Sequence, residues 1–130
     1  MRSVQDVITI LDAAVATGSG ATLLVEDFVN LTLALDSASS ANLTVKVQGS
    51  IQQLAPTWGS AQSASNQWDY LLLKDLEDGS SIDGDTGLVL SGSDDHRLFE
   101  VNVNGIRWLN LIVTARSAGS ITGKVKTFSA

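Results

Sequence analysis

A chain of 130 residues, 44% hydrophobic and only 17% charged, is long enough to bury a core and too apolar to be disordered. A net charge of −6 argues against nucleic acid as a partner, because phosphate binding takes clustered Lys and Arg. The chain has no Cys for disulfides or thiolate chemistry and no apolar run that could span a membrane, so we expect a soluble protein made in the cytoplasm.

The N-terminal part is expected to begin with an arm at residues 1–7, which overlaps a first strand near residues 4–11. The two faces of this strand are poorly separated, because apolar residues occur at both odd and even positions. A turn at GSG (18–20) and a short strand at residues 21–25 follow. The chain length favours a single domain over residues 1–130.

The clearest strand pattern lies between residues 28 and 47. Apolar residues alternate along 28–35 and again along 43–47, with the small and polar stretch DSASSAN (36–42) between them. Alternation with a period of two is typical of half-buried strands, so we predict a hairpin. Its inward row is predicted to be Val29, Leu31, Leu33, Leu35, Leu43, Val45 and Val47.

A long loop is predicted at residues 49–65, which carry Gly, Ser, Gln and the only Pro around Trp58. Long loops in compact domains are often functional. The next segment, NQWDYLLLKDL (66–76), has large apolar residues at odd and even positions, which predicts a strand contacted on both faces.

The remaining strands follow an acidic turn region, EDGSSIDGDTG (77–87). Residues 88–92 and 97–105 are strand-like, the second with Phe99, Val101 and Val103 inward, and a last hairpin is expected over 106–115 and 120–128. About eight short strands predict an all-β fold, a single antiparallel β-sandwich that is jelly-roll-like or immunoglobulin-like.

The segment 109–126 repeats features of the segment 29–47. Seven identities, such as Asn30 with Asn110, relate the two at an offset of 80 residues with a two-residue deletion in the turn. Common hairpin chemistry explains most of this likeness, and a duplication is the alternative. Either origin predicts equivalent positions for the two segments in the sandwich.

Candidate catalytic groups are few. Ser93, two Asp residues and His96 stand in one continuous run, but adjacent residues of an extended chain diverge and cannot form a catalytic triad. Paired carboxylates could serve a glycosidase, yet nothing in the sequence fixes the separation that this mechanism needs. We therefore expect that the protein is not an enzyme.

The acidic turn region offers oxygen ligands for calcium, with Asp75, Asp78, Asp83 and Asp85 as the candidate ligands. The stretch DGDTG is short and lacks the closing Glu of an EF-hand loop. A solvated turn, in which Asp and Gly occupy positions of positive φ, explains the same residues. We expect no cofactor, with calcium as the alternative.

The three Trp residues are the other large features. Trp68 and Trp108 lie inside predicted strands and are expected to pack in the core or at a subunit interface. Trp58 lies in the long loop and is the better contact candidate, whether to a sugar or to a protein.

The chain resembles the small β-sandwich structural proteins of tailed bacteriophages. The resemblance is carried by LTVKVQGS (43–50), by Trp68 in the next strand, and by VNVNGIRWLNLIVTARSAGSIT (101–122). The closing hairpin of that group matches at Gly105, Arg107, Leu109, Leu111, Thr114, Ala115, Ser117, Gly119, Ser120, Ile121 and Thr122. The likeness covers roughly residues 28–128.

The resemblance implies a virion protein that works by binding. A head decoration or cement protein would bind the major capsid protein where its subunits meet, commonly as a homotrimer, and would stabilise the shell. The contact candidates are Trp58 with its loop, Arg107, and Val4 and Val7 in the N-terminal arm. The alternatives are a tail, neck or fibre module and a carbohydrate-binding or host-attachment module.

Overall fold

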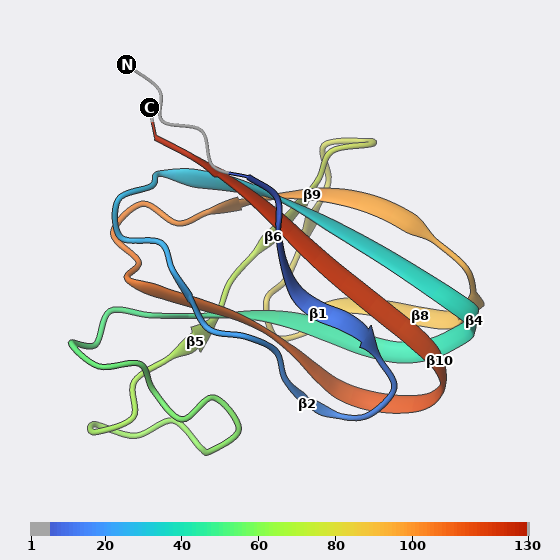
Figure 1. Ribbon diagram of the computed structural model, residues 1–130, viewed down its shortest axis with the longest axis horizontal. Helices are drawn as coiled ribbons and strands as arrows, with labels where there is room; N and C mark the ends of the chain where they lie inside the picture. The colour runs from blue at the N-terminus through green and yellow to red at the C-terminus, as the bar shows by residue number, and fades with distance from the viewer. Residues whose placement is uncertain (1–5, 130) are drawn as a thin grey trace.

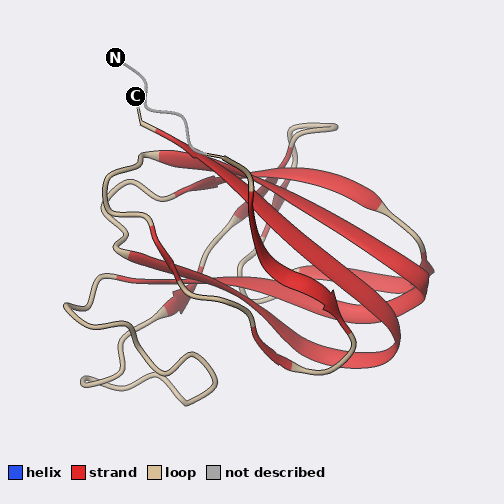
Figure 2. Cartoon of the chain, in the orientation of Figure 1, coloured by secondary structure: helices blue, strands red, loops and turns tan. Residues whose placement is uncertain are grey.

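The computed structural model describes residues 6–129, which form ten strands and no helix. The expected all-β, antiparallel class is confirmed (Figure 2). Accordingly, no helix of the described part is long and apolar enough to cross a membrane. The strands are β1 (Ile8–Ala14), β2 (Gly18–Ser19), β3 (Leu23–Leu24), β4 (Asn30–Ser50), β5 (Asp69–Tyr70), β6 (Leu73–Asp75), β7 (Ser81–Ile82), β8 (Leu88–Ser93), β9 (His96–Asn102) and β10 (Trp108–Phe128).

Two strands of 21 residues, β4 and β10, organise the molecule. Each crosses the molecule, bends back at the same end, and returns in the opposite layer (Figure 1). They pair with each other antiparallel over their whole length, from Trp108 opposite Ser50 to Phe128 opposite Asn30. The pairing of β4 with β10 therefore continues from one layer to the other, with register shifts at the bend.

The other strands extend the two layers from this central pair. The first layer contains β1, the second half of β10, the first half of β4, β9, β6 and β7. The second layer contains β2 and β3, the first half of β10, the second half of β4, and β5 and β8. The result is the expected sandwich, built as one folded sheet.

The predicted hairpin at residues 28–47 is corrected in one respect. The chain does reverse at Ser39 and Ser40, which have positive φ values of 63° and 53°. The two arms, however, are not hydrogen-bonded to each other, because each pairs with β10 in a different layer. Their inward rows meet across the core instead, so side-chain packing rather than a backbone ladder joins them.

The likeness between segments 29–47 and 109–126 has a structural counterpart. The segments belong to β4 and β10, and the first half of each pairs with the second half of the other. Both strands bend where they carry Ser and Ala, with Gly119 in addition in β10, and Ala118 lies opposite Asn42 at that bend. The expectation of equivalent positions is therefore confirmed, with bent strands in place of hairpins.

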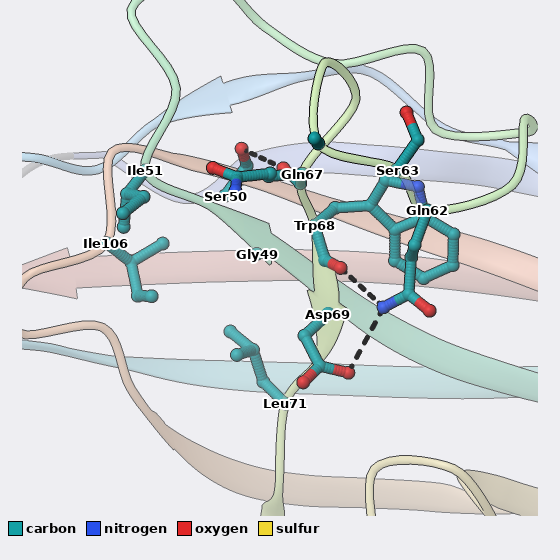
Figure 3. A pocket seen from close by; sticks show the side chains of 11 residues that line it. Gly49, Ser50, Ile51, Gln62, Ser63, Gln67, Trp68, Asp69, Leu71 and Ile106 are labelled. Atoms are coloured by element: carbon teal, nitrogen blue, oxygen red, sulfur yellow. Dashed lines mark hydrogen bonds between the residues drawn. The ribbon is translucent and has the colours of Figure 1, made fainter.

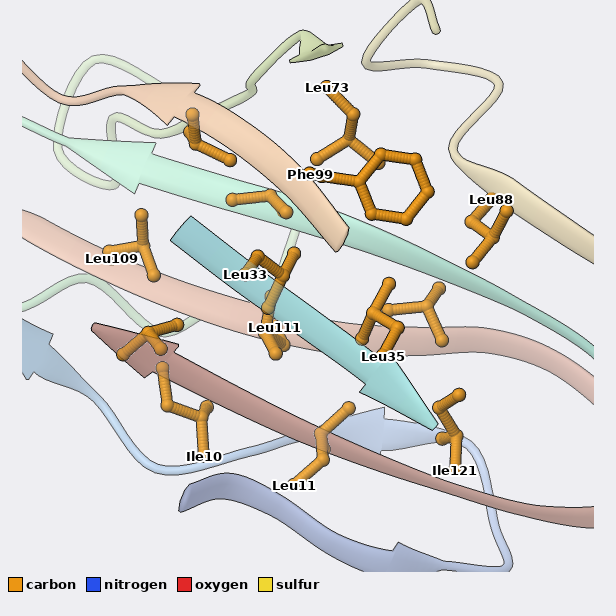
Figure 4. Packing of buried hydrophobic residues seen from close by; sticks show 14 of the residues in the cluster. Ile10, Leu11, Leu33, Leu35, Leu73, Leu88, Phe99, Leu109, Leu111 and Ile121 are labelled. Carbon is orange, nitrogen blue, oxygen red and sulfur yellow. The ribbon is translucent and has the colours of Figure 1, made fainter. Parts of the chain in front are cut away.

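The core lies between the layers and includes most of the predicted inward rows, together with residues such as Ile10, Leu111 and Ile121 (Figure 4). Leu31, Leu33 and Phe99 from the first layer and Leu111 from the second are almost completely buried. Of the row predicted along residues 29–47, only Val29, which directly precedes β4, is merely half-buried. Alternation of apolar residues thus located the core along β4.

The segment 66–76 differs from its prediction. Instead of one strand it forms the short β5 and β6, and Leu72 between them is 54% exposed while Leu73 is buried. The prediction of one continuous strand is therefore wrong, while Trp68 and Tyr70 on its outward row are half-buried and only Leu72 of that row is exposed within the chain. The first strand is also shifted toward the C-terminus, to β1.

The end of the sandwich where β4 and β10 bend, which we call the closed end, is tightly bonded. Ser37 Oγ accepts a hydrogen bond from the Asp95 amide at 2.7 Å, and the Ser40 amide donates to Asp94 Oδ1 at 2.7 Å. Gly119 has φ +76°, and a Cβ there would lie 2.4 Å from Ala41 Cα. Backbone contacts of this kind leave no space for a larger residue.

Candidate binding site at the open end

The loop predicted at residues 49–65 spans residues 51–68 in the structure and lies at the other end of the sandwich, which we call the open end (Figure 1). It connects β4 in the second layer to β5 at the edge of the same layer. An isolated bridge between Ser63 and Asn66 is its only strand-like pairing among the described residues. Besides a few backbone hydrogen bonds, such as that of 3.1 Å from the Ser60 amide to the Thr57 carbonyl, side-chain hydrogen bonds shape the loop.

Trp58 fastens this loop to the sandwich. Its side chain is only 5% exposed, and its indole Nε1 donates to Thr22 Oγ1 at 2.9 Å. Its carbonyl accepts a hydrogen bond of 2.9 Å from Nε2 of Gln48, which is itself bonded to Asn110 at 3.0 Å in the buried face of the second layer. The burial of Trp58 does not support the predicted contact role, because the ring anchors its own loop.

Asn66 closes the loop from within. Its Oδ1 accepts a hydrogen bond from the Thr57 amide at 2.8 Å, and its Nδ2 donates to the carbonyls of Thr57 and Ala61, both at 3.1 Å. Trp68 adds a hydrogen bond of 3.0 Å from its indole Nε1 to the Ser60 carbonyl. These bonds give a loop without regular structure a defined form.

A pocket of about 550 Å³ lies between this loop and the edge of the second layer (Figure 3). Its apolar wall is formed by Ile51, Leu71 and Ile106. Its polar wall is formed by loop residues and the start of β5. The polar lining residues are Ser50, Gln62, Ser63, Gln67 and Asp69, and Gly49, Ala64 and Trp68 complete the pocket. A volume of this size is typical of ligand sites.

A second hollow of about 290 Å³ adjoins the first and shares Ile51 and Ile106 with it. Its other lining residues are Glu26, Gln53, Gly105 and Arg107. We call the two hollows together the end groove. It runs from the Asp69 carboxylate, over an apolar centre, to the Arg107 guanidinium.

The charged groups at the two ends of the end groove differ in how they are satisfied. Arg107 forms an ion pair with Glu26, donates to the Gln53 carbonyl at 3.2 Å, and stacks over Trp108 with its guanidinium 5.2 Å from the ring centre. Asp69 Oδ1 accepts hydrogen bonds from the Tyr70 amide at 2.8 Å and from Gln62 Nε2 at 3.4 Å, but Asp69 forms no ion pair with any described residue. No cationic side chain of the described residues is thus paired with this carboxylate.

Tyr70, beside Asp69, is also affected by its surroundings. Burial, and then the negative charge of Asp85, raise the pKa of its hydroxyl above the usual 10.0. The ring contacts Trp68 edge-on at a centroid distance of 5.0 Å, and Lys46 Nζ lies 4.7 Å from its centre. Trp68 and Tyr70 thus pack against each other at the side of the pocket.

The remaining predicted contact residues lie in different places. Arg107 lines the end groove, Val7 is 57% exposed outside the groove, and Val4 lies outside the described residues. Sequence reasoning missed Ile51, although an isolated Ile in a polar loop was a usable signal. Leu71 and Ile106 gave no such signal, because each belongs to an apolar pattern that predicts burial.

The four proposed calcium ligands are not brought together as one cluster. No group of three or more His, Asp or Glu side chains suited to a metal occurs in the described residues 6–129. Asp75 is 4% exposed and paired with Arg97. Asp78 accepts hydrogen bonds from the Ser80 hydroxyl at 2.6 Å and the Ser80 amide, which lower the pKa of its carboxyl. The carboxylates of Asp75 and Asp78 are therefore engaged in contacts within the chain.

Asp83 and Asp85 are also part of a turn. Asp83 Oδ1 accepts a hydrogen bond of 3.3 Å from the Asp85 amide, while the Asp83 carbonyl accepts one from the Gly87 amide at 2.9 Å.

The side chains of Ser93 and His96 have different partners, as expected for neighbours on an extended chain. Ser93 Oγ donates to Asp95 Oδ2, whereas His96 Nδ1 lies 2.8 Å from Asp36 Oδ1. Ser93 and His96 are therefore not hydrogen-bonded to each other.

The architecture defines a class of antiparallel β-sandwich in which two long strands bend through both layers, and solved structures share it. One is the SPBc2 prophage-derived protein YomS, with a TM-score of 0.73 and 14% identity over 99% of this chain and 96% of that one. Another is the PBSX exported protein XepA, with a TM-score of 0.72 and 15% identity over 98% of this chain. The chain spans 38% of XepA. No family model and no curated protein sequence matches the chain.

Proposed function

We propose that this protein is a non-enzymatic structural component of a bacteriophage particle, and that it acts as a decoration protein on the head. The observation that carries the proposal is the fold, which corresponds over nearly the whole of both chains to that of the prophage-derived YomS. The sequence resemblance to small sandwich proteins of tailed phages supports the same assignment independently. In this role the protein is made in the host cytoplasm and becomes part of the virion.

The work of such a protein is binding rather than turnover. The partner is the major capsid protein, and three copies of the chain meet at a site where capsid subunits join. A stable interface buries about 800 Å² on each side. The end groove supplies an apolar centre for this contact, and the polar loop around it supplies the rim, which is the usual anatomy of a protein interface.

Purified protein mixed with undecorated phage heads tests the proposal. We expect saturable binding at symmetric positions, seen by electron microscopy, and a higher melting temperature of the shell. A Lys124→Ala variant on the outer face of the first layer serves as a control for nonspecific charge effects. If the heads bind nothing at concentrations well above micromolar, and the protein stays monomeric in light scattering, the decoration role is wrong.

A second candidate is a module of the tail, neck or fibre. It is favoured by XepA, in which the same fold occupies only 38% of a longer chain. Mass spectrometry of separated heads and tails distinguishes the two roles, because a decoration protein copurifies with heads alone. A carbohydrate-binding role depended on an exposed Trp58 and loses that support with the ring buried.

A further inference from the structure

The centre of the end groove is an apolar pocket that could accommodate one aliphatic side chain of a partner. Ile51 and Ile106 face Leu71 across the pocket (Figure 3), and Ile51 is 67% exposed. Leu71 lies flat against the backbone of Gly49, where a Cβ would approach within 2.8 Å of Leu71 Cδ1. Gly49 therefore lets Leu71 form the floor of the pocket. Branched side chains on several sides suit a Leu, Ile or Met from a partner.

The aromatic ring at this site is not presented for stacking. The Trp68 indole is held by its hydrogen bond to the Ser60 carbonyl and by its edge-on contact with Tyr70. In Figure 3 the ring lies beside Gln62, away from the aliphatic residues. Sugar recognition uses an exposed flat aromatic face, so the lining favours a protein side chain over a glycan.

The charged side chain beside this apolar centre is the Asp69 carboxylate. Asp69 lines the same pocket as Ile51 and Leu71 and has no ion-pair partner in the described part of the chain. The residues lining the pocket include no Lys or Arg. At the far end of the end groove, Arg107 is already paired with Glu26. A partner with a basic residue next to its aliphatic side chain would complement this arrangement.

We propose that the end groove binds an extended segment of a partner protein in which a large aliphatic side chain adjoins a Lys or Arg. The aliphatic side chain fills the space between Ile51, Leu71 and Ile106, and the basic group reaches the Asp69 carboxylate. The proposal rests on the proposed function only for the source of the segment, which would be another virion protein. The recognition chemistry itself comes from the end groove.

The test is a titration of the isotope-labelled full chain, followed by NMR, with the peptide acetyl-Gly-Ser-Lys-Leu-Ser-Gly-amide. We expect amide shifts at Gly49, Ile51, Asp69, Leu71 and Ile106. Replacing the peptide Leu by Ser should weaken binding about tenfold, as expected for losing a buried Leu. Replacing its Lys by Glu should weaken binding about threefold at low salt and less at high salt.

Variants of the chain locate the binding. Ile51→Ala should weaken peptide binding about fivefold without unfolding the protein, because the side chain is mostly exposed. Asp69→Asn keeps the acceptor for the Tyr70 amide and should abolish the preference for Lys over Glu. The matched control is Leu54→Ala, on the same loop, 78% exposed and outside both hollows. It should leave binding unchanged.

The outcomes separate this proposal from the proposed function. Shifts at the same amides with chitotriose and none with the peptide overturn it in favour of a glycan site, and no shift with either probe also overturns it. If Ile51→Ala protein still decorates heads with wild-type affinity, head decoration stands and the end groove is not its contact. If the peptide binds as expected but heads do not, the end groove stands and the decoration role is wrong.

Discussion

The two ends of the sandwich are built from different kinds of residue. At the closed end the chain passes between layers through Ser, Ala and Gly, and Ser37 bonds to Asp95 while Gly119 touches Ala41. At the open end the layers are joined by loops, with Ile51 exposed above a pocket. The closed end thus maintains the fold, which leaves the open end free to carry a binding site.

The largest effect is expected at the closed end, from Gly119→Val. A β-branched residue at φ +76° is strained, and its Cβ would meet the Ala38 carbonyl at 2.6 Å as well as Ala41. We expect a loss of about 4 kcal/mol in the free energy of unfolding, measured with urea. A loss below about 1 kcal/mol would mean that the bend can open at little cost in stability. That result would contradict the conclusion that the closed end maintains the fold.

Trp58→Ala tests the anchor of the loop at the open end. Removing a buried indole and its hydrogen bond to Thr22 should cost about 3 kcal/mol of unfolding free energy. Trp58→Phe, which keeps most of the ring, should cost about 1 kcal/mol, mainly from the lost hydrogen bond. Denaturant melts of both variants check this. Loss of head binding with unchanged stability would show instead that Trp58 is a contact residue.

Ser37→Ala and Ile51→Ala compare single side chains from the two ends. Ser37→Ala removes the acceptor of the Asp95 amide and the donor to the Ser93 carbonyl, so we expect a loss of about 1 kcal/mol. Ile51→Ala should change stability by less than about 0.5 kcal/mol, because its side chain is mostly exposed. Thermal melts suffice. An equal loss from both would remove the proposed division between the ends.

The smallest effect concerns the titration of Tyr70, which is the only Tyr in the chain. Its raised pKa means that the folded state favours the neutral hydroxyl, so stability is fully present below pH 10.0 and falls as the pH rises through the folded-state pKa. Tyrosinate absorbance measures this group alone. The midpoint should lie above 10.0 and move down in Asp85→Asn protein, whereas an unfolded control should titrate at 10.0.

The core could be predicted from the sequence, but the pairing of the strands could not. Alternation in β4 shows that Leu33 and Val45 point inward, because side chains of a strand alternate between its faces. It does not say which strand lies alongside. The two arms of β4 looked like a hairpin, yet both took β10 as their partner. That choice depends on contacts between residues distant in the chain.

The sequence predicted where the candidate site lies, but it did not predict most of the residues that form it. The loop after β4 was expected to be functional, and the end groove lies there. Trp58 looked exposed because it stands in a polar loop, but the outer face of the second layer has buried Gln48 and Asn110, which need a cover. Leu71 looked buried because it stands in an apolar run. Both errors have one cause, since loop packing is decided by tertiary structure.

The continuous pairing of β4 with β10 also has a kinetic consequence. During synthesis, Ser50 can pair with β10 only after Trp108 has been made, and Asn30 only after Phe128 has been made. Until then the two layers lack their central ladders. Closing such long loops is entropically costly, and folds dominated by distant pairings are slow to form. A nascent chain that ends before Trp108 therefore exposes unpaired edges of β4 in both layers, whereas one that ends near the bend of β10 leaves only the first-layer half of β4 unpaired. A ribosome-bound chain ending before β10 should be degraded by proteases, whereas the full-length chain resists them.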